Sequence, residues 1–267
     1  PTVIFLANYF KKNNIKAHVV SRGYGGKFKD IVFVDPRTHS AYQVGDEPLL
    51  ISQHAKVWVS KKKKEGILKA YKAGAELVLL DDGHQNFSIA KDVNILVFDS
   101  EVNLKNESIF PLGNLRESPR LAIDRADFLI SIGNSASNKN LQETIFQIYD
   151  QKIIEGKYKL NIIPKLKKRK LVAFCGIGRP EKFFSMLRKL NLEIFKEYSF
   201  PDHHLYSNRQ LTKILDIAAK NNALVVTTWK DFVKIPVTFK KNIYPLDIEL
   251  HLSKNKKLLL ELKKLVL

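Results

Sequence analysis

The sequence predicts an α/β protein that contains a parallel β-sheet, and three observations lead to this fold class. Short aliphatic runs alternate with segments whose apolar residues recur at helical spacing. One run, Leu77-Val78-Leu79-Leu80, has no polar alternation, which is typical of a strand buried on both faces of a parallel sheet. Glycines and charged residues follow several of the runs directly. The chain has 267 residues and is 45% hydrophobic, enough for the cores of about two domains.

The composition is strongly basic, with 45 Lys+Arg against 27 Asp+Glu and a formal net charge of +18. Such an excess favours anionic partners, namely nucleic acid, lipid surfaces or phosphorylated substrates. The alternative is a lysine-rich composition that serves solubility, in which runs such as residues 61–64 are solvated surface. The single cysteine, Cys175, excludes an internal disulfide and a Cys-based zinc cluster. No apolar run of about 18 residues occurs, so we expect no membrane-spanning helix and no signal peptide.

In the first half of the chain, helices and strands are predicted to alternate as in a doubly wound sheet. The predicted helices lie at 1–14 and 65–73, and the strands at 16–20, 31–34, 41–44, 56–59, 76–80, 94–99 and 127–132, with 31–34 and 41–44 forming a hairpin. A further helix begins near Pro48, because proline suits a first helical turn. Asp46 and Glu47 then lie near the positive end of its dipole. A plain acidic helix start is the alternative for these residues.

A second α/β segment is predicted after residue 169. Its strands are expected at 171–175, 193–198 and 223–228, and its helices at 181–190, 208–220 and 252–267. The leucine stripe of the last helix favours core packing over a membrane anchor. The region 101–120 lacks periodicity, and a short helix is expected at 141–147. The predicted division is a domain at 1–150, a lysine-rich linker at 151–168 and a smaller α/β domain at 169–267.

Asp81 and Asp82 follow the run at 77–80, where the strand must leave the sheet. Two adjacent carboxylates repel each other unless a cation or a proton offsets their charge. Ligands bind at the carboxyl ends of the strands in an open α/β sheet. We interpret this pair as a magnesium-and-phosphate corner that resembles the Walker B strand of P-loop enzymes. An ordinary acidic turn at a strand end is the alternative.

Polar clusters at several strand ends together indicate a site for phosphoryl transfer. The clusters contain Arg22, Asp46, Asp81 with Asp82, Asp202 with His203 and His204, and Lys230 with Asp231. Phosphoryl transfer needs a cation site, basic groups for the developing charge and a carboxylate aimed at the attacking hydroxyl. Histidine is a natural partner for such a carboxylate. A surface turn is the alternative for the two adjacent histidines, and Gly176-Ile177-Gly178 is only a weak nucleotide fingerprint because the third glycine is absent.

Seven motifs, taken in order, resemble one family, the tetraacyldisaccharide 4′-kinases of lipid A biosynthesis. They are Ser21-Arg22-Gly23-Tyr24-Gly25-Gly26, Val44-Gly45-Asp46-Glu47-Pro48-Leu49-Leu50, Asp81-Asp82-Gly83-His84-Gln85-Asn86, Leu115-Arg116-Glu117, Gly178-Arg179-Pro180-Glu181-Lys182-Phe183-Phe184, Phe200-Pro201-Asp202-His203-His204 and Thr228-Trp229-Lys230-Asp231-Phe232-Val233-Lys234. The resemblance implies a P-loop-NTPase-like parallel sheet domain and a second, smaller α/β domain. It also implies transfer of the γ-phosphate of ATP, with Mg²⁺, to the 4′-hydroxyl of a tetraacyldisaccharide 1-phosphate.

The resemblance assigns roles to individual residues. Asp46 would be the catalytic carboxylate and His203 its partner in a dyad, while Asp81 and Asp82 would hold Mg²⁺. The substrate and phosphate cleft would be lined by Arg22, Tyr24, Glu47, Gln85, Arg116 and Glu117, and the nucleotide side by Lys230 and Asp231. The implied location is peripheral, on the cytoplasmic face of the inner membrane of Gram-negative bacteria, with a glycolipid substrate and an anionic membrane surface as partners. No nucleic acid or obligate protein partner is expected, since RNP, zinc-finger and helix-turn-helix patterns are absent from the sequence.

The sequence departs from the family pattern at several points. His84, Asn86 and Trp229 replace the usual Phe, His and Glu, and an arginine expected after 57–59 is replaced within Lys61–Lys64, which loses the bidentate fork. The family's Gly-rich Walker A loop ends in Gly-Lys-Thr-Pro, whereas this sequence begins at Pro1-Thr2. Without that loop the β- and γ-phosphates lose their cradle, and the family's N-terminal membrane-binding helix is also absent. We therefore expect either a piece of a longer kinase, inactive in this form, or a degenerate relative.

Two other functions remain open at this point. One is a non-catalytic basic protein that binds anionic membrane or nucleic acid, for which Asp46 would be dispensable. The other is a P-loop enzyme that acts on a different acceptor.

Overall fold

The computed structural model describes residues 1–100, 109, 112–113, 115–133, 153–161, 163–253 and 255–266. The helix predicted at 141–147 lies outside the described residues. The described chain forms two compact units. The larger unit consists of Leu6–Asp81 and Leu160–Glu249, and the smaller unit of Pro1–Phe5, Asp82–Lys159 and Leu250–Leu267. Each unit is therefore discontinuous in sequence, and the independent domains predicted at 1–150 and 169–267 stay a prediction.

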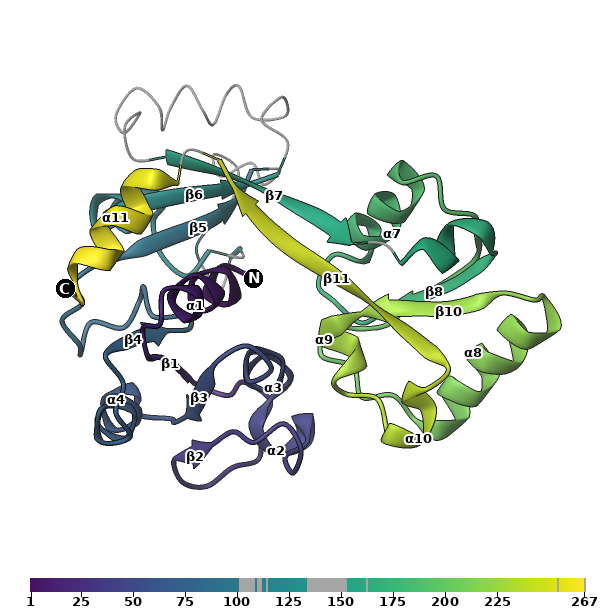
Figure 1. Ribbon diagram of the computed structural model, residues 1–267, viewed down its shortest axis with the longest axis horizontal. Helices are drawn as coiled ribbons and strands as arrows, with labels where there is room; N and C mark the ends of the chain where they lie inside the picture. Colours follow the sequence, from purple (N-terminus) through teal and green to yellow (C-terminus); the bar gives the residue numbers. More distant parts are fainter. Residues whose placement is uncertain are drawn as a thin grey trace. The chain divides into compact units, whose positions relative to one another are not determined.

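The first part of the larger unit is a four-stranded sheet in the order β2-β3-β1-β4 (Figure 1). Its strands are β1 (Ala17–Ser21), β2 (Val32–Phe33), β3 (Lys56–Val59) and β4 (Leu77–Leu80). β1 runs parallel to β3 and β4, with Val20 between Trp58 and Leu80, and only β2 is antiparallel. The predicted parallel sheet is confirmed. However, Leu79 is the one buried residue of β4 and the other three are partly exposed, so the expected burial of all four is wrong.

Helices α1 (Thr2–Lys12) and α4 (Lys63–Lys72) were predicted and are confirmed. The strand predicted at 41–44 is wrong, because these residues form the helical turn α2 (Ala41–Val44). Ser40 and Gln43 make a capping box there, and the Ser40 amide donates to Gln43 Oε1 at 2.8 Å. This pairing satisfies the free amides at the start of a helix and outweighs the β propensity of the segment. Helix α3 (Asp46–Ile51) follows directly, and its predicted start is confirmed.

The second part of the larger unit is built on parallel strands in the order β11-β10-β8-β9. Its elements are η3 (Pro164–Lys168), β8 (Leu171–Cys175), α7 (Pro180–Lys189), β9 (Ile194–Ser199), α8 (Asn208–Lys220), β10 (Leu224–Thr228), α9 (Trp229–Phe232), α10 (Val237–Lys240) and β11 (Ile243–Leu252). All five residues of β8 are buried. The strand therefore has core on both faces, as its unbroken apolar run predicts.

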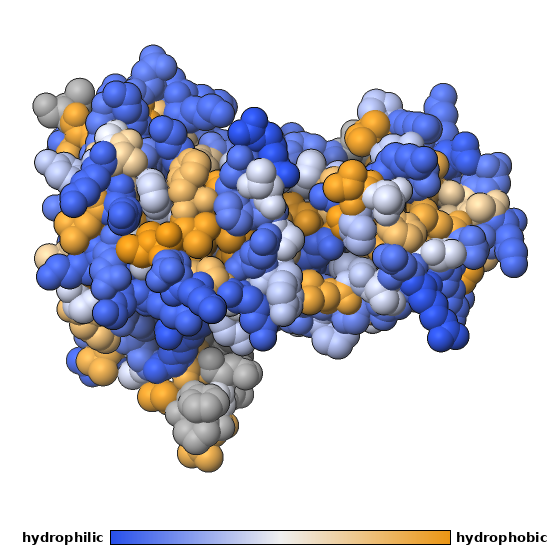
Figure 2. Space-filling view, turned by 90° about the horizontal axis from the view of Figure 1, so that it is seen from below, coloured by the Kyte–Doolittle hydropathy of each residue, from blue (hydrophilic) through white to orange (hydrophobic). Residues whose placement is uncertain are grey.

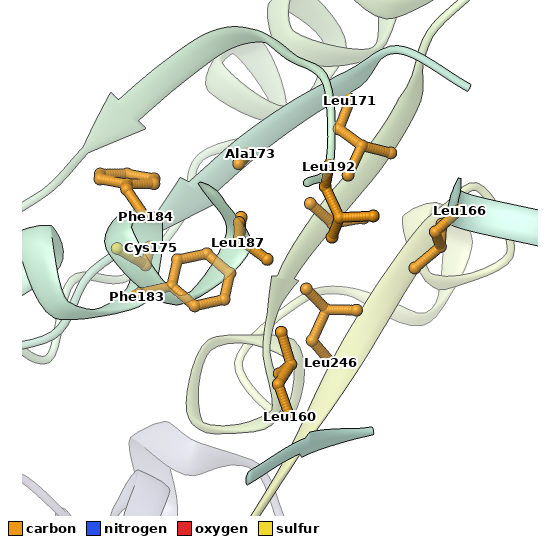
Figure 3. Packing of buried hydrophobic residues seen from close by; sticks show 11 residues of the cluster. Leu160, Leu166, Leu171, Ala173, Cys175, Phe183, Phe184, Leu187, Leu192 and Leu246 are labelled. Carbon is orange, nitrogen blue, oxygen red and sulfur yellow. The ribbon is translucent and has the colours of Figure 1, made fainter. Parts of the chain in front are cut away.

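The two cores of this part lie on opposite faces of β8 because side chains alternate along a strand. Leu171, Ala173 and Cys175 pack with Phe183 and Leu187 of α7, and Figure 3 shows this cluster at close range. The intervening residues, such as Phe174, pack instead with the buried face of α8. Burial raises the pKa of the Cys175 thiol to about 12, so this cysteine is an inert core residue.

The smaller unit contains parallel strands in the order β5-β6-β7. Its elements are β5 (Ile95–Asp99), α5 (Pro119–Asp124), β6 (Phe128–Ile132), the start of β7 (Ile153–Asn161), the end of β11 and α11 (Lys256–Lys264). Residues 153–161 were expected to be part of a polar linker, but they form strand β7. Ile154, Gly156 and Leu160 are buried on one face of β7, and exposed charged residues alternate with them on the other face. The sequence predicted a linker because the lysines of the exposed face dominate its composition. The predicted core packing of the last helix is confirmed, since Leu258 and Leu262 are buried.

The surface shown in Figure 2 is mainly hydrophilic, with scattered groups of hydrophobic residues. Throughout the described ranges, the helices are too short or too polar to cross a bilayer.

Candidate active site

Asp46 is a buried carboxylate at the first residue of α3, and its side chain is 5% exposed. It follows Gly45, whose φ of +92° and close approach to the Tyr24 carbonyl require a glycine. The Glu47 amide donates to Asp46 Oδ1 at 2.8 Å. A carboxylate in the first turn of a helix is also favoured by the unpaired amides there. The turn thus fixes the Asp46 carboxylate in one orientation.

His203 meets this carboxylate from the loop that follows β9. Its Nδ1 lies 2.9 Å from Asp46 Oδ2 and 3.0 Å from Oδ1, so the hydrogen bond requires a proton on Nδ1. The His203 backbone has a φ of +59°, and Asp202 Oδ1 accepts from its amide at 3.0 Å. The Tyr24 ring packs against the imidazole at a centroid distance of 5.4 Å. The structure therefore brings together the two residues that were predicted to form a dyad.

Lys230 lies beside this pair. Its Nζ is 3.2 Å from Glu47 Oε1, 3.4 Å from Asp202 Oδ1 and 3.5 Å from His203 Nε2. Burial lowers the pKa of Lys230, but the carboxylates of Glu47, Asp46 and Asp202 together outweigh burial and raise it. Lys230 is therefore a firmly charged ammonium that links α9 to the start of α3.

Asp231, the other residue predicted at the nucleotide side, is 0% exposed. Its carboxylate accepts hydrogen bonds from the Tyr206 hydroxyl at 2.8 Å and the Thr228 hydroxyl at 2.7 Å. Lys234 Nζ lies 2.9 Å from Asp231 Oδ1. Burial, followed by the Asp231 charge, raises the pKa of Tyr206, so this hydroxyl stays protonated. With its oxygens engaged in this way, Asp231 is placed to support the site from within, and its burial disfavours direct contact with a nucleotide.

Asp81 lies at the carboxyl end of β4, where its Oδ2 accepts from the Ser21 hydroxyl at 2.8 Å. Burial raises the pKa of Asp81 and the Glu47 carboxylate adds to the rise, while the Ser21 hydrogen bond and Lys63 oppose it. Lys63 is 7% exposed and donates to the Asp81 carbonyl oxygen. The expectation that the lysine run at 61–64 is wholly solvated is therefore wrong for Lys63. The end of β4 packs against the start of α4 and draws this one lysine inward.

The remaining predicted site residues are divided between the two units, and Asp82, Gln85, Arg116 and Glu117 belong to the smaller one. Asp82 has a φ of +51°, and its Oδ2 lies 2.6 Å from Arg116 Nη1 in an exposed ion pair. Glu117 pairs with Arg125 at 2.6 Å, and Gln85 is half-buried. In the larger unit, Arg22 is exposed and Tyr24 is 73% exposed.

The residues of the acidic corner fit a magnesium ion in donor chemistry. Mg²⁺ binds oxygen and is usually held by one or two carboxylates together with phosphate oxygens and water. Asp81 and Asp82 supply two adjacent carboxylates directly after β4, and burial raises the pKa of Asp81, a cost that a bound cation would offset. Groups of three or more possible protein ligands were not found among the described residues.

A small cavity of about 70 Å³ adjoins the dyad. It is lined by Tyr24, Gly25, Ala41, Tyr42, Gly45, Asp46, His203, Leu205 and Lys234. A larger hollow of about 650 Å³ in the same unit lies at the amino ends of β1 and β3. Ligands of parallel sheets bind at the carboxyl ends of the strands, so we place the site at the smaller cavity.

The family model described as tetraacyldisaccharide-1-P 4′-kinase matches residues 1–266. The chain belongs to this family. It is 36% identical over 254 residues to the tetraacyldisaccharide 4′-kinase of Paramagnetospirillum magneticum, which covers 94% of this chain and 76% of that protein. It is 39% identical over 242 residues to that of Rhodospirillum rubrum, covering 88% of this chain and 72% of the relative.

A solved structure agrees with the fold. The crystal structure described as the "apo" form of LpxK from Aquifex aeolicus in complex with ATP superposes with a TM-score of 0.77 at 27% identity. The match covers 99% of this chain and 84% of that one. The P-loop-NTPase-like fold class predicted for this member of the kinase family is therefore confirmed.

Sequence reasoning placed Asp202 in a polar cluster without giving it an individual role, and it assigned no site role to Ser21, Lys63 or Lys234. Asp202 and Lys234 stand within motifs that mark the kinase family, so their position was a usable signal. Lys63 was concealed in a lysine run. Its burial depends on contact with the end of β4, which no local pattern reveals.

Proposed function

We propose that this chain transfers the γ-phosphoryl group of ATP to the 4′-hydroxyl of a tetraacyldisaccharide 1-phosphate in lipid A biosynthesis. The observation that carries the proposal is the contact between His203 Nδ1 and the Asp46 carboxylate, made by residues 157 positions apart in a chain of this kinase family. Phosphoryl transfer requires a carboxylate that accepts the proton of the attacking hydroxyl. Asp46 supplies it, and His203 orients it.

Each step of the proposed phosphoryl transfer has a residue of this chain that would carry it. The 4′-hydroxyl gives its proton to Asp46, its oxygen bonds to the γ-phosphorus, and the bond to the β–γ bridging oxygen breaks to release ADP. Lys230 adds positive charge beside the dyad. Asp81 and Asp82 would hold Mg²⁺, which would neutralise charge on the phosphates.

We assign substrate contacts to the residues that the sequence predicted to bind substrate and phosphate. Tyr24 is the best supported, because its exposed ring covers one side of His203. Arg22, Glu47, Gln85, Arg116 and Glu117 complete the proposed set. We assign Lys230 to the nucleotide side of the site. Asp231 acts there indirectly, by positioning Tyr206, Thr228 and Lys234.

The same proposal includes a location. A kinase of an acylated, phosphorylated sugar works at a lipid surface, and the net charge of +18 favours an anionic one. We infer peripheral attachment to the cytoplasmic face of the bacterial inner membrane. The buried, hydrogen-bonded position of Asp46 favours this function over a non-catalytic basic protein, in which that carboxylate would be dispensable.

The direct test is an assay of the full-length gene product with radiolabelled ATP, Mg²⁺ and tetraacyldisaccharide 1-phosphate in detergent micelles. We expect one phosphate to be added to the 4′ position, as located by NMR of the product, and no product without Mg²⁺. An active enzyme that phosphorylates a different acceptor, or a wild-type protein that transfers nothing, would overturn the proposal.

A further inference from the structure

Lys234 carries a deeply buried ammonium group next to the proposed dyad. Its side chain is 1% exposed, and its Nζ lies 2.9 Å from Asp231 Oδ1 and 3.8 Å from Asp46 Oδ2. Within the part of the chain that the structure describes, Nζ makes no contact with hydrogen-bond geometry. The ammonium is therefore held by ion pairing between two carboxylates.

The position of Lys234 is fixed on several sides. Asp231, one helical turn before it, is held by the hydroxyls of Tyr206 and Thr228 at 2.8 and 2.7 Å. The Thr228 hydroxyl also accepts from the Asp231 amide at 3.1 Å and so caps α9. The Tyr206 ring centroid lies 5.6 Å from Lys234 Nζ, within range of a cation–π contact. This arrangement holds the ammonium on the side of the Asp46 carboxylate next to Oδ2.

Burying such a group is costly, which makes a purely structural role a weak explanation. Replacing a buried ion pair by apolar residues of similar volume is often neutral or stabilising. A buried cation is best explained by a carboxylate that must remain charged. Asp46 is such a carboxylate, because it has to be ionised to accept a proton from the acceptor hydroxyl.

The charged groups around Asp46 come from three elements. His203 faces it from the loop after β9, Glu47 follows it in α3, and Lys230 and Lys234 approach from α9 and the residues after it. Lys230 has Glu47 and Asp202 as its closer partners. Lys234 is thus the lysine whose charge is shared between Asp231 and Asp46.

We propose that Lys234 is a positioning residue for the phosphoryl transfer, acting through Asp46. Its ammonium lies beside Oδ2 and holds the Asp46 carboxylate turned toward His203, so that the proton of the acceptor hydroxyl passes to Asp46 as that oxygen bonds to the γ-phosphorus and the bond from the γ-phosphorus to ADP breaks. The inference rests on the proposed function and deepens it. It adds a third side chain, supported from inside by Asp231, to the dyad.

The test compares Lys234→Met, which removes the charge and keeps the length, with Lys241→Met, which removes an exposed lysine of the same unit. We expect kcat of Lys234→Met to fall at least about tenfold relative to the wild type, with little change in KM for ATP. This loss is part of the rate enhancement that a positioned general base supplies. We expect its pH–rate profile to differ from that of the wild type, because the substitution removes a positive charge 3.8 Å from the proposed proton acceptor. Lys234→Arg, which keeps the charge, should restore the wild-type profile.

A second readout does not need turnover. The ring signals of His203 in a histidine NMR spectrum, assigned with His203→Gln, should shift in Lys234→Met and stay in place in Lys241→Met. The chain has 7 histidines, so the spectrum is simple enough to assign. If the His203 signals shift but the protein phosphorylates nothing, the proposed function is wrong and the contact of Lys234 with the dyad still stands. Unchanged His203 signals, or a Lys234→Met enzyme with wild-type kcat and pH profile, would show that Lys234 does not act through Asp46. If Lys234→Met does not fold, Lys234→Gln, which also removes the charge, is measured in its place, and a wild-type kcat in that variant contradicts the proposal.

Discussion

Two carboxylate-centred clusters of this chain differ in how they are held. Asp46 is buried and touches His203, the Glu47 amide and the shared charge of Lys234. Asp82 is exposed, and its ion pair with Arg116 has side chains that are 59% and 66% exposed. In the proposed reaction, proton transfer depends on the geometry that the first cluster fixes. The second is an ion pair that water reaches on both side chains.

The two clusters also differ in how much their ion pairs contribute to the stability of the fold. An exposed ion pair contributes little to stability, because water screens the charges and ordering the side chains costs entropy. A buried pair is expensive to form, yet removing one partner strands the other charge in the core. We therefore expect substitutions at the Asp46 cluster to have large effects, and substitutions at the Asp82 pair to affect ligand binding far more than folding.

Replacing the proposed proton acceptor should have the largest effect. We expect Asp46→Asn in the full-length enzyme to lower kcat by about 10²- to 10⁴-fold, the range that a positioned general base supplies. His203→Gln should act in the same direction. Asp216→Asn, an exposed change on α8, is the matched control for the assay. Wild-type turnover in Asp46→Asn would show that the buried cluster is not the reaction centre.

Breaking the buried support of that cluster should cost stability. Asp231→Ala leaves Lys234 without its 2.9 Å partner and removes the acceptor of the Tyr206 hydroxyl. We expect the free energy of unfolding to fall by about 3–5 kcal/mol, measured by equilibrium urea denaturation. If the free energy of unfolding fell no more than it does for a substitution of an exposed residue, the buried network around Asp231 would not stabilise the fold.

Asp81 lies between the two extremes, and its effect should depend on pH. Burial, aided by the Glu47 charge, raises its pKa above the value of 3.8 that holds in the unfolded chain. Its contribution to stability is therefore most favourable at acidic pH and is lost as the pH rises through the folded-state pKa. Asp81→Asn should raise Tm at about pH 7 and change it much less at about pH 4. Mg²⁺ should raise Tm of the wild type but not of Asp81→Asn, and a variant less stable than the wild type at both pH values would contradict the assignment.

The exposed pair should give the smallest effect on folding. Arg116→Ala is expected to reduce the free energy of unfolding by less than about 1 kcal/mol, with a difference from the wild type that shrinks further in high salt. Urea denaturation at two ionic strengths measures it. A larger loss would mean that the Asp82–Arg116 pair is as constrained as the buried cluster.

The sequence predicted those elements whose burial is visible in their own pattern of apolar residues. It did not predict elements that are buried or paired only through distant parts of the chain. The unbroken run of β8 was found because both of its faces are buried. Helix α8 was found because apolar residues recur along it at helical spacing, which is a local signal. Strand β7 was hidden by its lysines, and β11 was not predicted, because the pairing partners that make an alternating segment a strand lie far away in sequence.

The same distinction applies to the site. Asp46 and His203 were paired in advance only through the order of family motifs, since nothing local links them. Lys63 and Lys234 were missed because a lysine is ordinarily exposed, and only tertiary contacts bury these two. Residues whose role depends on an unusual environment are the ones that single-sequence reasoning leaves out.

The distance in sequence between Asp46 and His203 has a consequence for biosynthesis. A ribosome adding about 5–20 residues per second makes Asp46 roughly 8–31 s before His203, since 157 residues separate them. During that interval the Asp46 turn has neither its imidazole nor the lysine that follows later in the chain. The proposed centre therefore cannot form until most of the chain has been made.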